Sequence, residues 1–143
     1  MNSLFSPFRN FGITDPGPSA VLLALRLVAG LGFIFHGYRK IINPFEWMGP
    51  DAFAPGIFQA LAAVSEFGGG IAWMVGLLTP LASLGIASTM AVAVTVHVSR
   101  GDPFVGHGGS FELPLLYFFI AIALIVIGPG RYSIDAKLFG NKK

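Results

Sequence analysis

The sequence predicts an all-α protein, a bundle of four transmembrane helices in up-down-up-down order. The 143-residue chain is 54% hydrophobic and only 11% charged, whereas soluble domains carry about 25% charged residues. Four apolar segments approach the ~20 residues that a helix needs to cross about 30 Å of hydrocarbon. A soluble domain of this size would leave too much of that apolar surface exposed to water.

The predicted spans cover residues 18–42, 57–78, 80–99 and 111–128. The first opens at Pro18, which the first turn of a helix tolerates. Between the second and third, Thr79 is a candidate cap and Pro80 a candidate first helical residue, so this turn is very short. The fourth ends at the sequence GPG, where the proline offers no backbone donor. We expect one domain over residues 1–143, without an internal repeat.

The ends of the chain bear on its orientation. Residues 1–17 lack the continuous apolar core of a signal peptide. We expect this segment either to lie in the membrane interface or to form a loosely ordered tail. Four spans place both termini on one side. That side carries Arg9, Arg131, Lys137, Lys142 and Lys143, against Arg39, Lys40 and Arg100 on the other. Basic residues favour the cytoplasmic side, so we expect cytoplasmic termini.

The composition also excludes several kinds of chemistry. The chain contains no cysteine, which removes disulfides, thiol redox chemistry and thiolate metal sites. Any redox role must therefore use a bound cofactor or a partner protein. The net charge of +2 and the lack of a long basic run argue against nucleic-acid binding. The three histidines show neither HxxxH nor ExxH spacing, so we expect no metal site and disfavour haem.

Ionisable residues within the apolar spans are candidate functional residues, because an unpaired charge in hydrocarbon is costly. They are Arg26, His36, Arg39, Lys40, Glu66, His97 and Glu112. Arg26 lies about 12 Å into the first span, and Glu66 roughly 13–15 Å into the second from the opposite side. These similar depths predict an Arg26–Glu66 interaction, direct or through water. Two interpretations stay open: a structural ion pair that fixes helix register, or a polar centre that binds a ligand or relays protons.

Helical periodicity groups several of these residues. Arg26, Gly30, Phe33, Gly37 and Lys40 share one stripe of the first span, with His36 at its edge. In the second span, the sequence EFGGG places Gly69 and Gly70 one turn after Glu66, and Trp73 follows. Small residues beside a charge let another helix approach closely and leave room for a flat ligand. We expect both stripes to face the interior of the bundle.

A second cluster is predicted from depth alone. His36, His97 and Glu112 lie near the same end of three different spans, so inward-facing side chains would form a His/Glu site in the outer half of the bundle. Each residue also has a structural interpretation. Glu112 suits a helix N-terminus, and His97 is able to bond a backbone carbonyl. Arg39 and Lys40 are long enough to reach the lipid headgroups.

A quinone head group suits these candidates better than haem does. It needs one or two hydrogen-bond donors, a carboxylate or histidine that exchanges protons, and an aromatic slot partly open to lipid. Candidate slot residues are Phe33, Tyr38, Phe67 and Trp73. Aromatic residues are common in any helical bundle, so this indication depends on the ionisable residues beside them.

Three stretches carry a recognisable set of motifs: RLVAGLGFIFHGYRKI, EFGGGIAWMVGLLTPLASLG and FELPLLYFFIAIALIVIGPGRYSID. In that order they resemble the DoxX family of small four-helix membrane proteins, over about residues 20–136. The resemblance implies a bacterial inner-membrane location. The name-giving member is similar to a subunit of a terminal quinol oxidase or thiosulfate:quinone oxidoreductase. Relatives are linked to oxidative-stress defence or to resistance to quinones and catechols. The matching positions are His36, Gly37, Lys40 and Glu66, with Glu112 and Asp135 as weaker matches.

The first functional hypothesis is a membrane subunit of a quinone-linked oxidoreductase system. Its catalytic candidates are His36 and Glu66, which would exchange protons with a quinone or hydrogen-bond it. Its ligand-binding candidates are Arg26, Lys40, Trp73, His97 and Glu112. In this hypothesis Arg26 keeps Glu66 ionised and Lys40 positions the head group.

The second hypothesis is a non-catalytic membrane anchor or assembly partner for a soluble oxidoreductase. The chain has no cysteine, haem motif or nucleotide-binding loop, which favours this role over a self-sufficient enzyme. A transporter fits less well, because four spans without an inverted repeat need a second copy to form a pathway. The expected partners are the lipid bilayer and either another protein or a second copy of this chain. Whether the chain is itself catalytic stays open.

Overall fold

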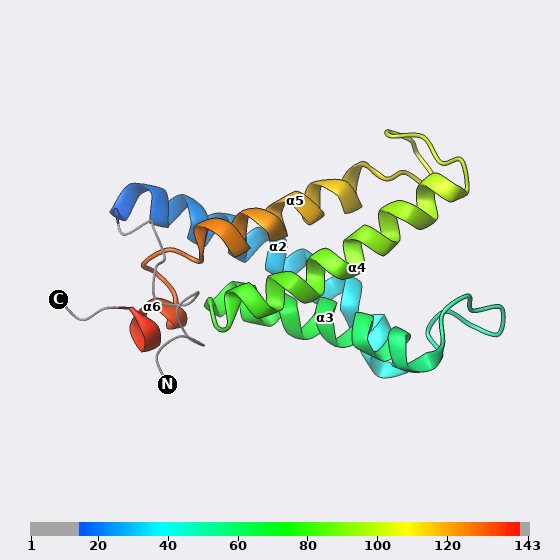
Figure 1. Ribbon diagram of the computed structural model, residues 1–143, viewed down its shortest axis with the longest axis horizontal. Coiled ribbons are helices and arrows are strands. Elements are labelled where there is room, and N and C mark those ends of the chain that lie inside the picture. The colour runs from blue at the N-terminus through cyan, green and yellow to red at the C-terminus, as the bar shows by residue number, and fades with distance from the viewer. Residues whose placement is uncertain (1–14, 141–143) are drawn as a thin grey trace.

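The computed structural model describes residues 15–140 and is built from helices. They are α2 (Pro16–Ile42), α3 (Gly56–Val75), α4 (Thr79–Ser99), α5 (Glu112–Ile127) and the short α6 (Ile134–Phe139) (Figure 1). No strand occurs in this part of the chain. The predicted all-α class and the bundle of four long helices are confirmed. The expectation for the N-terminal segment falls largely on residues 1–14, which lie outside the described residues.

The four long helices differ in how well they match a membrane. By length and composition, α2, α3 and α4 are each able to cross it. The predicted fourth span is a helix as well, but α5 has 16 residues, about 24 Å at 1.5 Å per residue. It ends at Gly128, whose positive φ of 84° suits glycine and whose N–H donates to the Leu124 carbonyl. The four helices therefore span unequal lengths of the bundle.

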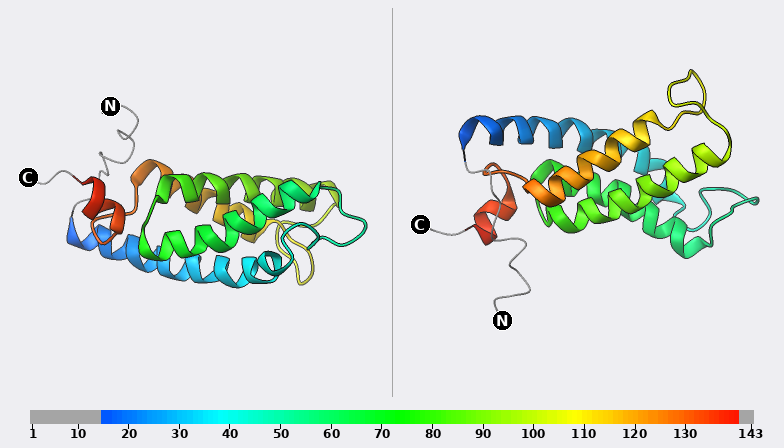
Figure 2. Two further views of the ribbon diagram at one scale, coloured as in Figure 1. Left: turned by 90° about the horizontal axis from the view of Figure 1, so that it is seen from below. Right: turned by 45° about the horizontal axis from the view of Figure 1, so that its top comes forward.

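Neighbours in sequence are neighbours in space. Helix α2 packs along α3, α3 along α4, and α4 along α5 (Figure 2). The loops over residues 43–55 and 100–111 lie at the end of the bundle opposite α6 (Figure 1). The outward faces are apolar, with Val28, Phe35 and Val126 all more than 70% exposed. Such faces suit lipid, because hydrocarbon does not penalise apolar surface as water does.

Helices α2 and α3 approach each other most closely at glycines. A Cβ atom at Gly30 would lie 2.6 Å from the Gly70 carbonyl oxygen, and one at Gly37 would lie 2.5 Å from the Phe67 nitrogen. Any side chain at either position would push the helices apart. The buried stripe of α2 includes Arg26 as well as these glycines, which confirms the predicted inward face.

The centre of the bundle is an apolar core around Trp73, which is fully buried. The Phe33 ring packs edge-on against Trp73, with 5.4 Å between the ring centroids. Trp73 Nε1 donates a hydrogen bond of 2.9 Å to Ser83 Oγ on α4. Its one polar atom is thereby satisfied inside the core, as buried indole groups usually are.

A buried polar cluster closes the end of the bundle beside α6. Arg26 is fully buried, and it donates from Nη1 to the Trp73 carbonyl at 3.1 Å and from Nη2 to the Tyr132 carbonyl at 2.6 Å. Asp135, also fully buried, accepts hydrogen bonds from the backbone N–H groups of Leu78 and Thr79 at 2.7 and 2.8 Å. A carboxylate of α6 therefore caps the start of α4.

The prediction that Thr79 caps α4 is wrong. Thr79 is the first helical residue, and the cap position belongs to Leu78, which has a φ of 48°. The buried Thr79 hydroxyl has no hydrogen-bond partner among residues 15–140. Because Asp135 lies more than fifty positions away in the chain, local sequence around the turn does not reveal it.

The predicted Arg26–Glu66 interaction is also wrong. Arg26 bonds carbonyls near the C-terminal end of α3 and in the segment before α6, while Glu66 pairs with Lys40. The prediction assumed that α2 begins level with the end of α3. In fact α2 has 27 residues and α3 has 20, and the first ten residues of α2 extend about 15 Å past α3. Counting residues from the start of α2 therefore placed Arg26 too close to the level of Glu66.

Replacing Asp135 by Ala is expected to destabilise the protein by about 3 kcal/mol, because it leaves the backbone N–H groups of Leu78 and Thr79 without their acceptor at the start of α4. Equilibrium unfolding in detergent micelles measures this loss. Asp51→Ala, which removes an exposed carboxylate in the 43–55 loop, is the control and should change stability by about 0.5 kcal/mol or less. Equal effects of the two substitutions would contradict the capping role.

Candidate functional site

The central feature of the site is an ion pair between α2 and α3. Lys40 Nζ lies 2.7 Å from Glu66 Oε1, and the two side chains are 23% and 2% exposed. The second carboxylate oxygen of Glu66, Oε2, is buried and has no hydrogen-bond partner within the described part of the chain. A buried acceptor without a partner is costly. Glu66 Oε2 is therefore the atom at which a ligand or water would bond.

The close helix contact sets this pair in place. Gly37 lies one turn before Lys40, and its backbone packs against Phe67, the residue after Glu66. The backbones are close enough for the lysine to reach the carboxylate across the interface. The sequence predicted that Gly37, Lys40 and Glu66 face the bundle interior, and the structure brings them together.

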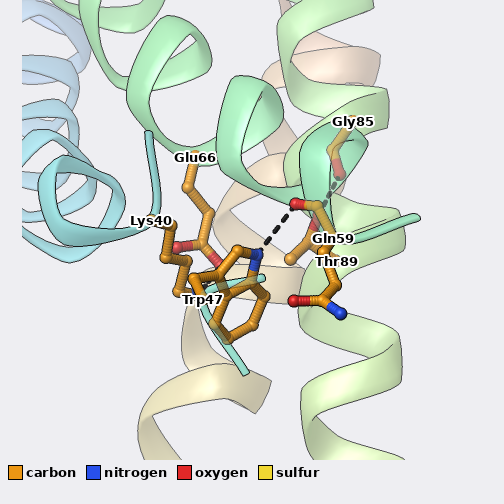
Figure 3. Close-up of polar contacts among 6 residues, drawn as sticks. All are labelled: Lys40, Trp47, Gln59, Glu66, Gly85 and Thr89. Carbon is orange, nitrogen blue, oxygen red and sulfur yellow. Dashed lines mark hydrogen bonds and ion pairs between the residues drawn. The ribbon is translucent and has the colours of Figure 1, made fainter. Parts of the chain in front are cut away.

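Trp47, from the loop over residues 43–55, lies against Lys40 beside the ion pair (Figure 3). Lys40 Nζ lies 4.4 Å from the centroid of the Trp47 ring, a cation–π contact. Trp47 Nε1 donates to the Gln59 carbonyl at 2.9 Å. The buried Gln59 side chain fastens the loop, because its Oε1 accepts from the Met48 N–H at 3.0 Å and its Nε2 donates to the Ala54 carbonyl at 2.9 Å. The sequence analysis did not identify Trp47 and Gln59 as site residues.

Two cavities adjoin the ion pair. The inner cavity, of about 370 Å³, is lined by residues from all four long helices and from the 100–111 loop, with His36, Lys40, Glu66 and His97 on its polar side. Phe33 and Tyr117, with ring centroids 4.6 Å apart, form an aromatic wall. The loop cavity, of about 570 Å³, lies beneath the 43–55 loop between α3 and α4. Both cavities share Lys40, Glu66, Ala93 and His97. The ion pair therefore lies between two hollows.

His97 forms a second polar pair at the rim of the site. Its Nδ1 lies 2.7 Å from Asp102 Oδ2, and both side chains are about one quarter exposed. A carboxylate on one imidazole nitrogen orients the ring and leaves the other nitrogen, Nε2, for another partner. Asp102 was not among the predicted residues. Its position five residues after His97, just past the end of α4, is the signal that was available.

The structure assembles some of the predicted site residues and separates others. His36 lines the inner cavity, although its side chain is largely exposed. Glu112 is exposed on the first turn of α5 and lies outside both cavities. Trp73 is enclosed in the core, and Arg26 belongs to the cluster at the opposite end. The site is thus formed by Lys40 and Glu66, with histidines from α2 and α4 at its edge.

The polar residues do not form a metal-binding arrangement. Over residues 15–140, no three or more His, Asp or Glu side chains are grouped closely enough to hold a metal ion. The arrangement offers a lysine that donates, a carboxylate with a free oxygen, and two imidazoles. These groups are able to bind an acceptor oxygen and exchange protons with it.

The DoxX family matches residues 21–98, a region that contains His36, Lys40, Glu66 and His97. The chain belongs to the DoxX family. It is 32% identical to Inner membrane protein YqjF of Escherichia coli (strain K12), over 85% of this chain and 93% of that protein. It is 29% identical to Uncharacterized membrane protein Rv3486 of Mycobacterium tuberculosis (strain ATCC 25618 / H37Rv), over 85% of this chain and 83% of the relative.

The DoxX-family assignment agrees with the apolar helices, and this chain is a membrane protein. No solved structure shows a significant match to it. The resemblance read from the three sequence stretches is confirmed at the level of the family.

Gly37→Ala is expected to destabilise the protein by about 1–3 kcal/mol, because the new methyl group overlaps the Phe67 backbone and forces α2 away from α3. The matched control is Gly68→Ala, where the nearest atom to the new Cβ, Val64 Cγ1, lies 3.9 Å away. That change should be neutral or stabilise by about 1 kcal/mol through helix propensity. Denaturant unfolding in micelles compares them, and equal stability of both variants would count against the glycine contact.

Proposed function

We propose that this DoxX-family protein is a membrane subunit of a quinone-linked oxidoreductase system and that it binds the quinone head group at the Lys40–Glu66 pair. The observations that support the proposal are that Glu66 lines two cavities and that its buried Oε2 has no hydrogen-bond partner within residues 15–140. Ligand sites are typically apolar hollows of a few hundred Å³ with a small number of convergent polar groups. The inner cavity has this character.

The residues of the site fit the chemistry of such a ligand. Conversion of a quinone to its quinol consumes electrons and protons in equal number. Lys40 Nζ donates a hydrogen bond to a ligand oxygen, and Glu66 Oε2 accepts one from a hydroxyl group. His36 and His97 at the cavity edge exchange protons between the carboxylate and the surface. The chain has no cysteine, so the electrons come from a partner protein in this proposal.

The aromatic wall supplies the remaining part of the fit. The Phe33 and Tyr117 rings face the inner cavity from α2 and α5, and a flat ring stacks favourably on such side chains. Of the four slot residues expected from the sequence, Phe33 lines this cavity, whereas Trp73 packs against Phe33 in the core. The wall therefore combines Phe33, which the sequence indicated, with Tyr117, which it did not.

The binding site is tested with a quinone that carries no long side chain. Quenching of tryptophan fluorescence reports its binding to the purified protein in micelles, because Trp47 stacks on Lys40. Glu66→Gln and Lys40→Met are each expected to weaken binding by about tenfold or more, the loss of one charge-assisted hydrogen bond. Glu112→Gln, an exposed change outside both cavities, is the control. Unchanged quinone affinity in both Glu66→Gln and Lys40→Met would contradict the assignment of the binding site to this pair.

A second candidate function is a non-catalytic anchor or assembly partner for a soluble oxidoreductase. The Lys40–Glu66 pair joins α2 to α3, and an ion pair of this kind is able to fix helix register without binding any ligand. The same binding experiment separates the candidates. If the protein is an anchor, the added quinone should quench the tryptophan fluorescence of the wild-type protein and of all three variants to the same extent. Lys40→Met should then change the stability of the protein instead.

We also propose that the protein lies in the bacterial inner membrane with cytoplasmic termini. The name of the Escherichia coli relative supports the location. Lys40 is neutralised by Glu66, which leaves Arg39 and Arg100 as the unpaired basic residues expected outside. Arg131 and Lys137 lie at the α6 end, and the positive-inside rule favours the cytoplasm for that end once the basic terminal residues are counted.

The lack of cysteine makes this orientation directly measurable. Single Lys137→Cys and Asp51→Cys variants place one thiol at each end of the bundle, both at exposed positions. A membrane-impermeant maleimide added to intact spheroplasts is expected to label Asp51→Cys, and to label Lys137→Cys only after the membrane is opened. The reverse pattern would establish the opposite orientation.

A further inference from the structure

An open groove runs along the outside of the bundle between α3 and α4. Its volume is about 450 Å³, and its lining includes Ser65, Gly68, Leu78, Ala82, Gly85 and Ser88. Ser65, Gly85 and Ser88 also line the loop cavity. The two hollows therefore adjoin, and together they lead from the α3–α4 turn to the Lys40–Glu66 pair.

Small residues keep this groove open. A Cβ atom added at Gly68 would have only Val64 Cγ1 within 4 Å, at 3.9 Å, so the missing side chain leaves free space. Gly85 packs against Ser65, whose Oγ would lie 2.8 Å from a Cβ atom there. This contact holds α3 and α4 together at the junction between the groove and the loop cavity.

The hydroxyl groups along α4 do not make the path polar. Ser88 Oγ donates to the Leu84 carbonyl at 2.9 Å, and Thr89 Oγ1 donates to the Gly85 carbonyl at 3.0 Å (Figure 3). Hydroxyls bonded back to their own helix present mainly their carbon atoms to a neighbour. Within residues 15–140, no charged residue lines the groove itself, whereas the loop cavity at its end is lined by Lys40, Glu66, His97 and Arg100.

We propose that this groove holds the isoprenoid side chain of the quinone whose head group lies at Glu66, so that the ligand is a membrane-resident quinone. The inference rests on the proposed function. One polar end followed by a long apolar path matches an amphiphile with one polar head. The unpaired Glu66 Oε2 marks the head position. From Ser88 to Leu78 the groove follows ten residues of α4, about 15 Å.

The position of the groove also suits entry from the bilayer. Leu81 and Leu84, which line it, are about 60% exposed on the outer face of α4. A chain dissolved in lipid therefore reaches the groove sideways without crossing water. The alternatives are an acyl chain of an ordinary lipid or a helix of a second copy. Continuity with the Glu66 site favours the side chain of the bound quinone over both.

The test compares two quinones with the same ring, one with a decyl side chain and one with a methyl group in its place. Affinities are measured by tryptophan quenching in micelles and corrected for partition into detergent. The wild-type protein is expected to bind the decyl compound at least about tenfold more tightly, because burial of each methylene is favourable. Ser88→Phe should remove this preference and leave methyl-quinone affinity within about twofold.

Ser88 is exposed, so a larger side chain there fills the groove without entering the core. Ala91→Phe is the matched control, since Ala91 is exposed on the same helix and lines neither hollow. Gly68→Leu fills the groove from α3 and should act like Ser88→Phe. If Ser88→Phe and Gly68→Leu both remove the preference for the decyl compound, the reduced volume of the groove causes the change, and not the replacement of one particular residue.

Other outcomes overturn the inference in distinguishable ways. Equal affinity of the wild-type protein for both quinones rejects the groove but leaves the head-group site standing. Displacement of the decyl compound by an equal concentration of decanoic acid identifies a general lipid site. A change from dimer to monomer in Ser88→Phe identifies a surface between two copies. If neither quinone binds the wild-type protein, the proposed function fails and the inference fails with it.

Discussion

The backbone contact between α2 and α3 is the constraint on which the rest of the structure depends. Gly30 of α2 meets Gly70 in the last third of α3, and Gly37 meets Phe67 nearer the loop end. In a membrane, helices gain little from excluding water, so close packing at small residues is a main source of association. This contact fixes the axial register of α2 against α3. It thereby determines which polar groups of the two helices are able to meet.

That register separates two polar centres along α2. Arg26 reaches the end of α3 and lies near the cap formed by Asp135, whereas Lys40 reaches Glu66 beneath the 43–55 loop. The two centres are fourteen residues apart on one helix, about 21 Å. At the α6 end, the guanidinium donates to two backbone carbonyls and the carboxylate accepts from two backbone N–H groups. The Asp135 bonds cap the start of α4, and the Arg26 bonds tie α2 to the end of α3 and to the segment before α6.

The limits of the sequence analysis follow from the same register. Periodicity correctly identified the inward faces, because the face of a helix depends on angle alone. Periodicity does not determine the axial position of one helix relative to its neighbour. For that reason the predicted partner of Arg26, Glu66, was wrong. Asp135 and Trp47 act through loops and a short helix, whose path a single sequence does not specify. Glu112 was placed correctly in depth, yet its side chain points outward from the first turn of α5.

The two polar centres differ in the space that adjoins them, and this difference decides which one is the candidate ligand site. Arg26 also has one unpaired atom, Nε, so an unsatisfied polar atom alone does not identify a site. Arg26 lines none of the three hollows described above, whereas Glu66 lines two of them. A polar residue that lines a hollow lies beside space that a ligand is able to occupy, whereas one enclosed in packed structure does not. The adjoining volume therefore makes the Lys40–Glu66 pair, and not Arg26, the candidate site.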